Sequence, residues 1–203
     1  MRLFAALELP KDVKDAIAEW WIGTSAALHP GEWRDVPKEN WHLTLGFFGD
    51  VNGGEVVDLA EALEDCAARS PVQHLCLRDV GMFPNLNRPK VFWIGVAQTD
   101  DGGRLKSLAH CCRRAARATV RKRTAKDEVF RGHVTLARRR GEPFPVDPRM
   151  LAAMPDLPEQ QWQVDTIILY QSELRPDGAR YRVLEEFELA APDAYDRTAK
   201  RGE

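Results

Sequence analysis

The sequence predicts a mixed α+β fold made of two similar lobes. Segments with the apolar alternation of strands interchange with segments that carry an apolar residue every three or four positions, as amphipathic helices do. Short runs of Gly, Pro and Asn separate these segments. A tetrapeptide of the form His-x-Thr-Leu occurs in each half of the chain, at 42–45 and at 133–136. This near-duplication indicates two lobes whose motif strands line one groove, with helices on the outer faces.

The first half of the chain predicts alternating strands and helices. Apolar residues alternate with other types in the strand segments, and they recur at helical spacing in the helix segments. Pro30, Gly31 and Pro37 mark the loop before the motif strand, and the Asn-Gly-Gly turn at 52–54 leads into the second helix. The expected elements are a strand at 2–9, a helix at 11–28, the motif strand at 41–51 and a helix at 55–69.

The second half repeats this alternation with more strands. Turn-forming residues at 81–89 separate its first two strands, and we expect this linker to lie over the cleft. Pro143 and Pro145 break the chain after the second motif, and a Pro-Asp-Gly turn at 176–178 predicts a terminal hairpin. The expected elements are strands at 72–80 and 91–97, a helix at 103–119, the motif strand at 132–138, a short helix at 148–154, and strands at 161–171 and 181–189.

Length and composition indicate one globular domain. The chain has 203 residues, of which 44% are hydrophobic and 30% charged, so it is long enough to bury a substantial core. We expect a single two-lobed domain over 1–190 and a polar, disordered tail over 191–203. Charged residues and Pro10 interrupt the short apolar run at the start, and no apolar run is long enough to cross a bilayer. We therefore expect a cytoplasmic protein without membrane contact, and we expect it to be a monomer.

The four cysteines, Cys66, Cys76, Cys111 and Cys112, show no spacing typical of a metal site. Because a cytoplasmic chain keeps its thiols reduced, we expect free thiols buried on helix and strand faces. His110 lies beside two of these cysteines, but no second histidine follows four residues later. We expect neither a metal site nor a cofactor.

Basic residues gather on both sides of the second motif, although the net charge of −2 excludes a general nucleic-acid coat. From 113 to 126 the chain has no acidic residue. The basic residues are Arg113, Arg114, Arg117, Arg121, Lys122, Arg123 and Lys126, followed by Arg131, Arg138, Arg139 and Arg140. Charge runs are usually solvated surfaces. Because this run leads into the motif strand, however, we expect part of it to contact an RNA backbone.

Each motif presents a histidine and a threonine to one side of a strand. Successive side chains of a strand alternate between its faces, so His42 shares a face with Thr44, and His133 shares a face with Thr135. One such pair alone would most often be a polar pair at a sheet edge. Imidazole has an unperturbed pKa of about 6.5, so one histidine can act as a neutral base while the other acts as a protonated acid. With hydroxyls donating to anionic oxygens, these groups suit metal-free opening of a phosphodiester.

The motifs and their neighbours resemble those of the 2H phosphoesterase superfamily, and within it the branch of RNA 2',3'-cyclic phosphodiesterases, historically called 2'-5' RNA ligases. The chain departs from this branch at Gly132, where proline is usual, and at Gly46, where arginine is frequent. The stretches that carry the resemblance are 2–10, 41–49 (Trp-His-Leu-Thr-Leu-Gly-Phe-Phe-Gly), 90–96, 130–138 (Phe-Arg-Gly-His-Val-Thr-Leu-Ala-Arg) and 169–174, which leads to Tyr181.

The resemblance implies a two-lobed α+β fold in which antiparallel sheets line a central cleft and helices cover the outer faces. It also implies metal-free hydrolysis of RNA 2',3'-cyclic phosphate ends, tRNA fragments among them, to 2'-phosphates, with reversible 2'-5' ligation as a second activity. His133 is expected to activate water and His42 to protonate the departing 3'-oxygen, although the sequence also allows the reverse order. Thr44 and Thr135 are expected to hold the phosphate oxygens.

Further residues are expected to contact the substrate. Arg131 or Arg138 would add positive charge to the pentacoordinate phosphate, although Arg138 also fits a solvent-facing strand end. Phe48, Phe130 and Tyr181 are candidates for stacking on the terminal base or ribose. For each of them a place in the core is the more common outcome, because aromatic residues in strands usually pack inside.

Two alternative functions stay open. The first is a phosphodiesterase for a small cyclic nucleotide or nucleotide sugar, which comparing an oligonucleotide with a mononucleotide substrate would reveal. The second is an RNA-binding module without turnover. The intact pair of histidines and threonines argues against this second alternative, because binding alone needs no acid and base.

Overall fold

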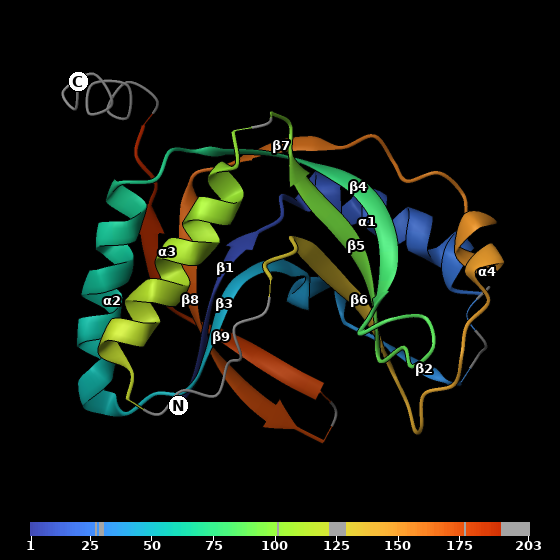
Figure 1. Ribbon diagram of the computed structural model, residues 1–203, viewed down its shortest axis with the longest axis horizontal. Helices are drawn as coiled ribbons and strands as arrows, with labels where there is room; N and C mark the ends of the chain where they lie inside the picture. The colour runs from blue at the N-terminus through green and yellow to red at the C-terminus, as the bar shows by residue number, and fades with distance from the viewer. Residues whose placement is uncertain (27, 29–30, 101, 122–128, 177, 192–203) are drawn as a thin grey trace.

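The computed structural model describes residues 1–26, 28, 31–100, 102–121, 129–176 and 178–191 of the chain. In these residues it is an α+β fold, as the sequence predicts (Figure 1). The elements in order are β1 (Arg2–Glu8), α1 (Lys11–Ser25), β2 (Trp33–Asp35), the 3-10 turn η1 (Lys38–Asn40), β3 (His42–Asp50), α2 (Gly53–Ala68), β4 (Gln73–Phe83), β5 (Val91–Gln98), α3 (Arg104–Thr119), β6 (His133–Arg139), α4 (Pro148–Ala152), β7 (Gln161–Val164), β8 (Thr166–Arg175) and β9 (Gly178–Glu188).

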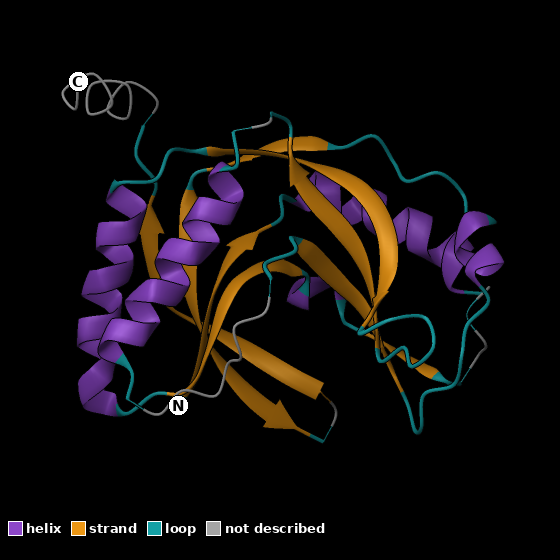
Figure 2. Cartoon of the chain, viewed as in Figure 1, coloured by secondary structure: helices purple, strands orange, loops and turns teal. Residues whose placement is uncertain are grey.

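The two lobes are the halves of one curled antiparallel sheet (Figure 2). The strand order is β7-β4-β5-β6-β3-β1-β8-β9, and β2 pairs with β6. The motif strands β3 and β6 join the halves where Leu43 lies opposite Val134. The expected two-lobed arrangement is therefore confirmed, with the junction of the lobes at the two motifs.

Helices cover the outer faces of both halves (Figure 2). In α1, Trp21 packs on Phe92 of β5, with the ring centroids 5.0 Å apart. Helices α2 and α3 pack on each other, and α3 contacts β3. An Asn52–Glu55 capping box begins α2. No helix in the described part of the chain is long and apolar enough to cross a membrane.

The apolar half of each motif anchors its strand in the core. Leu43, Leu45, Val134 and Leu136 are each 0% exposed. Burying such a side chain stabilises a fold by roughly 2 kcal/mol. Because the four leucine and valine side chains lie on the core face, the intervening histidines and threonines must lie on the opposite face.

The segment at 161–171, which the sequence predicts as one strand, is two strands in different lobes. The chain turns at Asp165: β7 pairs with β4 at one edge of the sheet, and β8 pairs with β1 in the other half. A local apolar pattern indicates that a segment is extended, but it does not indicate which strand the segment pairs with. The terminal hairpin of β8 and β9 is confirmed. The tail residues 192–203 and Asp177 lie outside the described residues.

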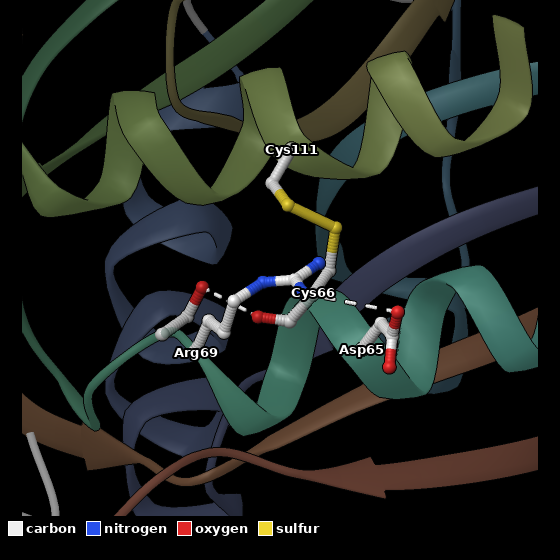
Figure 3. Close-up of a disulfide and its surroundings, with 5 residues drawn as sticks. Asp65, Cys66, Arg69 and Cys111 are labelled. Carbon is white, nitrogen blue, oxygen red and sulfur yellow. Dashed lines mark hydrogen bonds and ion pairs between the residues drawn. A yellow bond between two sulfur atoms is a disulfide. The ribbon is translucent and has the colours of Figure 1, made fainter. Parts of the chain in front are cut away.

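The expectation of four reduced thiols is wrong for one pair. Cys66 of α2 and Cys111 of α3 form a disulfide, with their Cα atoms 5.9 Å apart (Figure 3). Cys76 and Cys112 are free thiols. The two bonded residues are separated by 45 positions, so only the packing of the two helices brings them together.

Candidate active site

A cleft of about 590 Å³ lies where the two half-sheets meet. Its walls include His42, Thr44, His133 and Thr135. The antiparallel pair of Leu43 and Val134 accounts for this grouping. On either side of that pair, the register brings the histidine of each motif next to the threonine of the other. The structure thus brings together all four side chains that the motifs predict for one site.

Both histidines are held by the same type of hydrogen bond. The Nδ1 atom of His42 lies 2.7 Å from the carbonyl oxygen of Asn40, and that of His133 lies 2.8 Å from the carbonyl oxygen of Arg131. A carbonyl oxygen only accepts, so each Nδ1 carries a hydrogen and donates it. Nε2 is then the nitrogen that is left to accept or donate a proton on the cleft side. For His42, Nε2 lies 3.0 Å from Oγ1 of Thr44.

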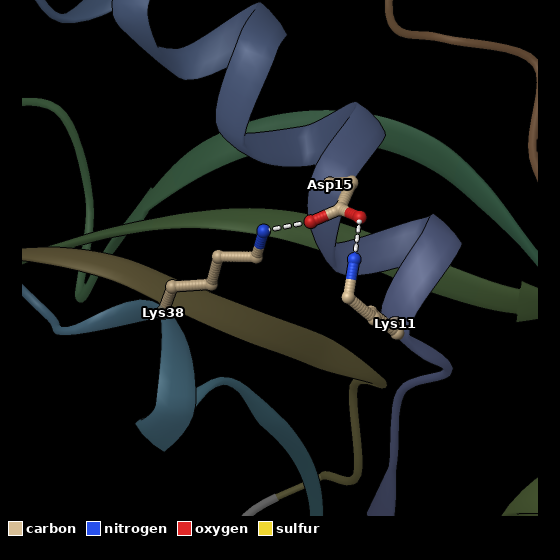
Figure 4. A network of polar contacts seen from close by, with 3 residues as sticks. All are labelled: Lys11, Asp15 and Lys38. Atoms are coloured by element: carbon tan, nitrogen blue, oxygen red, sulfur yellow. Dashed lines mark hydrogen bonds and ion pairs between the residues drawn. The ribbon is translucent and has the colours of Figure 1, made fainter.

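The short turn η1 fixes the carbonyl that orients His42. Lys38 of η1 and Lys11 of α1 both bind the carboxylate of Asp15 (Figure 4). These hydrogen bonds lower the pKa of Asp15 to about 2, and the one from Lys11 has a larger effect than the one from Lys38. The carboxylate is therefore charged at neutral pH. The side chain of Asn40 donates to the carbonyl of Ala179 at 2.8 Å. The turn is therefore tied both to α1 and to β9.

The protein surroundings favour the neutral form of both imidazoles. The pKa of His42 is lowered to about 4, mainly by burial and also by the charges of His133, Lys14 and Arg138, while the hydrogen bond to the Asn40 carbonyl opposes this shift. Burial also lowers the pKa of His133, as do the charges of Arg138 and Arg131. A bound anion would oppose these effects, because negative charge favours the imidazolium.

Aromatic rings from four strands cause much of this burial. The His42 ring lies 4.9 Å from Phe4 and 5.2 Å, edge-on, from Tyr181. The His133 ring lies 4.8 Å, edge-on, from Phe83, and Trp93 follows at 6.3 Å. Tyr181, a predicted substrate contact, thus reaches the cleft. Sequence reasoning missed Phe4 and Trp93, because nothing in their own segments separates them from ordinary core residues.

The phenylalanine of β3 that reaches the cleft is Phe47, and the expected residue, Phe48, packs in the core. Phe48 is 3% exposed, whereas Phe47 is 55% exposed and lines the cleft. The reason is a β-bulge: Thr44 lies opposite Ala6 and Gly46 lies opposite Ala5, so β3 advances two residues where β1 advances one. The extra residue reverses the alternation of side chains after Thr44. Phe130, the third expected aromatic residue, lines the cleft.

The arginines that flank the second motif have different surroundings. Arg138 lines the cleft, close enough to influence both histidines. Arg131 also lines it, with Nη2 bound to Asp79 at 2.8 Å and its guanidinium 4.2 Å above the Trp93 ring. Arg139 points elsewhere: its side chain is 1% exposed and pairs with Glu32 at 2.8 Å. This last arginine is a structural residue. Lys122, Arg123 and Lys126 of the basic run lie outside the described residues.

Two glycines allow close approaches around the motifs. A Cβ atom at Gly132 would lie 2.5 Å from the carbonyl oxygen of Val96, a clash that any side chain would create. A Cβ atom at Gly46 would lie 3.1 Å from Cγ of Arg113. The Arg113 side chain therefore passes over Gly46, and its Nε donates to the carbonyl of Leu45 at 3.1 Å.

In the described part of the chain, no three His, Cys, Asp or Glu side chains gather closely enough to hold a metal ion. The groups that line the cleft include two imidazoles, two threonine hydroxyls and one tyrosine hydroxyl, the Lys90 ammonium, the Asn40 amide, arginine guanidiniums and aromatic rings. This set can bind an anion, exchange protons with it and stack on a planar base.

Comparisons with known proteins agree with this set of groups. Residues 7–93 match the family described as LigT like Phosphoesterase. The RNA 2',3'-cyclic phosphodiesterase of Thermus thermophilus is 32% identical, over 100% of this chain and 98% of that protein. The RNA 2',3'-cyclic phosphodiesterase of Escherichia coli is 30% identical, over 93% of this chain and 96% of that protein.

Solved structures show the same fold. The crystal structure of a Thermus thermophilus protein superposes with a TM-score of 0.78 and 31% identity, covering 95% of this chain and 100% of the other. Escherichia coli LigT in its apo form superposes with a TM-score of 0.71 and 26% identity, covering 93% of this chain and 97% of the other.

Proposed function

The chain belongs to the LigT-like phosphoesterases, the family of the RNA 2',3'-cyclic phosphodiesterases, and on this premise we propose that it hydrolyses the 2',3'-cyclic phosphate at the end of an RNA strand to a 2'-phosphate. The observation that carries the proposal is the pair of imidazoles in one cleft, each with Nδ1 bound to a backbone carbonyl two residues earlier. Relatives of that name match nearly the whole chain, which supports the choice of substrate.

The proposed reaction is an in-line displacement at phosphorus. A water oxygen forms a bond to phosphorus while the bond from phosphorus to the 3'-oxygen breaks. His133 takes a proton from the water, and His42 gives a proton to the 3'-oxygen. Thr44 and Thr135 donate hydrogen bonds to the non-bridging oxygens, and Arg138 stabilises the negative charge of the pentacoordinate state.

The division of labour between the histidines depends on the substrate. With its pKa at about 4, the His42 imidazole is almost entirely in its neutral form at neutral pH, with Nε2 unprotonated. The cyclic phosphate is an anion, and its charge raises the pKa of whichever imidazole lies nearer to it. In this proposal the anion makes His42 the acid. If it raised the pKa of His133 instead, the two roles would be exchanged.

We propose reversible 2'-5' ligation as a second activity of the same site. A 5'-hydroxyl that replaces water would form the bond to phosphorus, with the same 3'-oxygen leaving, and the product would carry a 2'-5' linkage. In the reverse reaction the 3'-hydroxyl would attack phosphorus and the 5'-oxygen would leave, which cleaves the 2'-5' linkage and restores the cyclic phosphate. Ligation therefore needs no catalytic group beyond those of hydrolysis.

A single incubation tests the reaction and the substrate class. Purified protein in chelator receives a short RNA with a 2',3'-cyclic phosphate end, alongside a mononucleotide 2',3'-cyclic phosphate, and the position of the product phosphate is determined. We expect a 2'-phosphate from the RNA. A 3'-phosphate would contradict the proposed leaving group. Turnover of the mononucleotide alone would favour the small-substrate alternative, and binding without turnover of either would favour the RNA-binding module.

Location and assembly are also proposals. We propose a cytoplasmic monomer that acts on RNA ends, tRNA fragments among them; in that compartment the Cys66–Cys111 disulfide would be an exception to the usual reduced state of thiols. Cell fractionation and light scattering of the purified protein would test the location and the monomeric state.

A further inference from the structure

A second groove runs from the catalytic cleft along one face of α3. It has a volume of about 710 Å³ and shares Arg113, Val129 and Phe130 with the cleft. The two hollows are therefore continuous. When a ligand longer than one nucleotide has its end in the cleft, the rest of it can extend into the groove past these three residues.

The groove is lined by basic side chains at helical spacing. Lys106, His110, Arg114 and Arg117 are exposed and follow one another every three or four positions, so they lie on one face of α3. No acidic side chain lines this groove within the described residues. The hollow on the other side of α3, against α2, is different, because five carboxylates outnumber its two arginines; Arg117 lies at the border and lines both hollows. The side chains concerned are Glu55, Asp58, Glu61, Glu64, Asp65, Arg117 and Arg121. An anionic chain is thus attracted to the first face and repelled from the second.

The passage between cleft and groove is built from an arginine and an aromatic ring. Arg113 crosses over Gly46, and its guanidinium carbon lies 5.4 Å from the centre of the Phe130 ring. The hydrogen bond that Nε of Arg113 donates to the carbonyl of Leu45 holds the side chain against β3. A cation beside a ring face suits a nucleotide, since the ring can stack on a base and the cation can bind the adjoining phosphate.

We propose that this groove binds the RNA strand on the 5' side of the cyclic phosphate. Lys106, Arg114 and Arg117 contact successive phosphates, and Phe130 stacks on a base at the passage. The inference rests on the proposed function, because it takes the RNA end to lie in the catalytic cleft. It adds a reason why the enzyme would prefer an RNA strand to a single nucleotide, since only a strand reaches α3.

The number of phosphate contacts determines how strongly the RNA affinity should depend on salt. Each phosphate contact with a single strand contributes about −0.7 to the slope of log affinity against log salt, so three contacts predict a fall of about twentyfold between 50 and 200 mM salt. In a variant that keeps only one of the three contacts, the affinity should fall by only about threefold between 50 and 200 mM salt. A mononucleotide makes none of these contacts and should show no such additional loss.

The test compares Lys106→Gln/Arg114→Gln with the wild-type chain. A labelled hexanucleotide ending in a 2'-phosphate, which is the product and is not consumed, is titrated by fluorescence anisotropy at 50 and 200 mM salt. In parallel, kcat/KM is measured for the hexanucleotide and the mononucleotide cyclic phosphates. The control is Arg149→Gln, an exposed arginine of α4, a helix that lies on the opposite side of the molecule from α3 (Figure 1). Circular dichroism checks that each variant is folded.

We expect the double variant to lose affinity and salt dependence for the hexanucleotide, with a selective loss of kcat/KM on that substrate, while the control matches the wild type. Equal salt slopes for wild type and double variant would overturn the inference. Equal kcat/KM for hexanucleotide and mononucleotide in the wild type would also overturn it and would leave the proposed hydrolysis intact. If the wild type turned over neither substrate, the proposed function would fail, and the anisotropy titration would still decide whether the groove binds RNA.

Discussion

The pKa of His42 gives the sharpest test of the catalytic scheme. Burial and nearby positive charge lower this pKa to about 4, so at pH 7 about one molecule in a thousand carries the proton that the acid must donate. To serve as the acid, His42 needs a pKa near 7 in the substrate complex. That is a rise of about 3 units, or about 4 kcal/mol.

A bound phosphate can supply an energy of this size. A unit negative charge about 4 Å from the imidazolium contributes about 4 kcal/mol at an effective dielectric constant of about 20. The sign follows from the charges: an anion stabilises the protonated imidazole, and therefore raises its pKa. We predict that binding of a nucleoside 2'-phosphate raises the pKa of His42 to near neutrality.

The measurement is an NMR titration of the histidine ring signals from pH 3.5 to pH 8.5, with and without saturating nucleoside 2'-phosphate. His42→Gln and His133→Gln assign the two cleft signals. His74 and His110 lie outside the cleft lining and serve as internal references. If the ligand raised the pKa of His133 to near 7 and left that of His42 near 4, His42 would be the base and His133 the acid. If it raised neither, the two-histidine scheme would be refuted.

Further measurements test other parts of the structure. Replacing His42 or His133 with alanine should lower kcat about a hundredfold or more, because each performs one proton transfer, and near-normal turnover by either variant would contradict that role. Both kcat and kcat/KM should be bell-shaped functions of pH. Because the bound phosphate raises the histidine pKa values, the optimum of kcat should lie at higher pH than that of kcat/KM. Coincident optima would contradict this. Phe47→Ala should raise KM with little effect on the unfolding temperature, because this ring is 55% exposed in the cleft, and an unchanged KM would remove it from the site. Replacing both Cys66 and Cys111 with serine should lower the free energy of unfolding by about 4 kcal/mol, since the bond closes a loop of about 45 residues; equal denaturant midpoints for variant and wild type would contradict this.

Several features of the site depend on contacts that local patterns do not contain. Phe47 replaces Phe48 in the cleft because the pairing of β3 with β1 inserts a bulge, and a bulge belongs to a pair of strands. The low pKa of His42 comes from burial among rings of distant segments, such as Phe4 and Tyr181. Arg139 belongs to the same basic run as the cleft residues, yet its packing against Glu32 makes it structural.

The sequence by itself determined the α+β class, the strand character of the two motifs, and which face of each strand carries His42, Thr44, His133 and Thr135. These features follow from alternation along a strand, which is a property of neighbouring residues. Only the tertiary structure decided that the strand at 161–171 divides between two lobes, that α2 and α3 are joined by a disulfide, and that α3 carries a basic groove into the cleft. Those outcomes depend on how segments far apart in the chain pack against each other, and no local pattern specifies the partner.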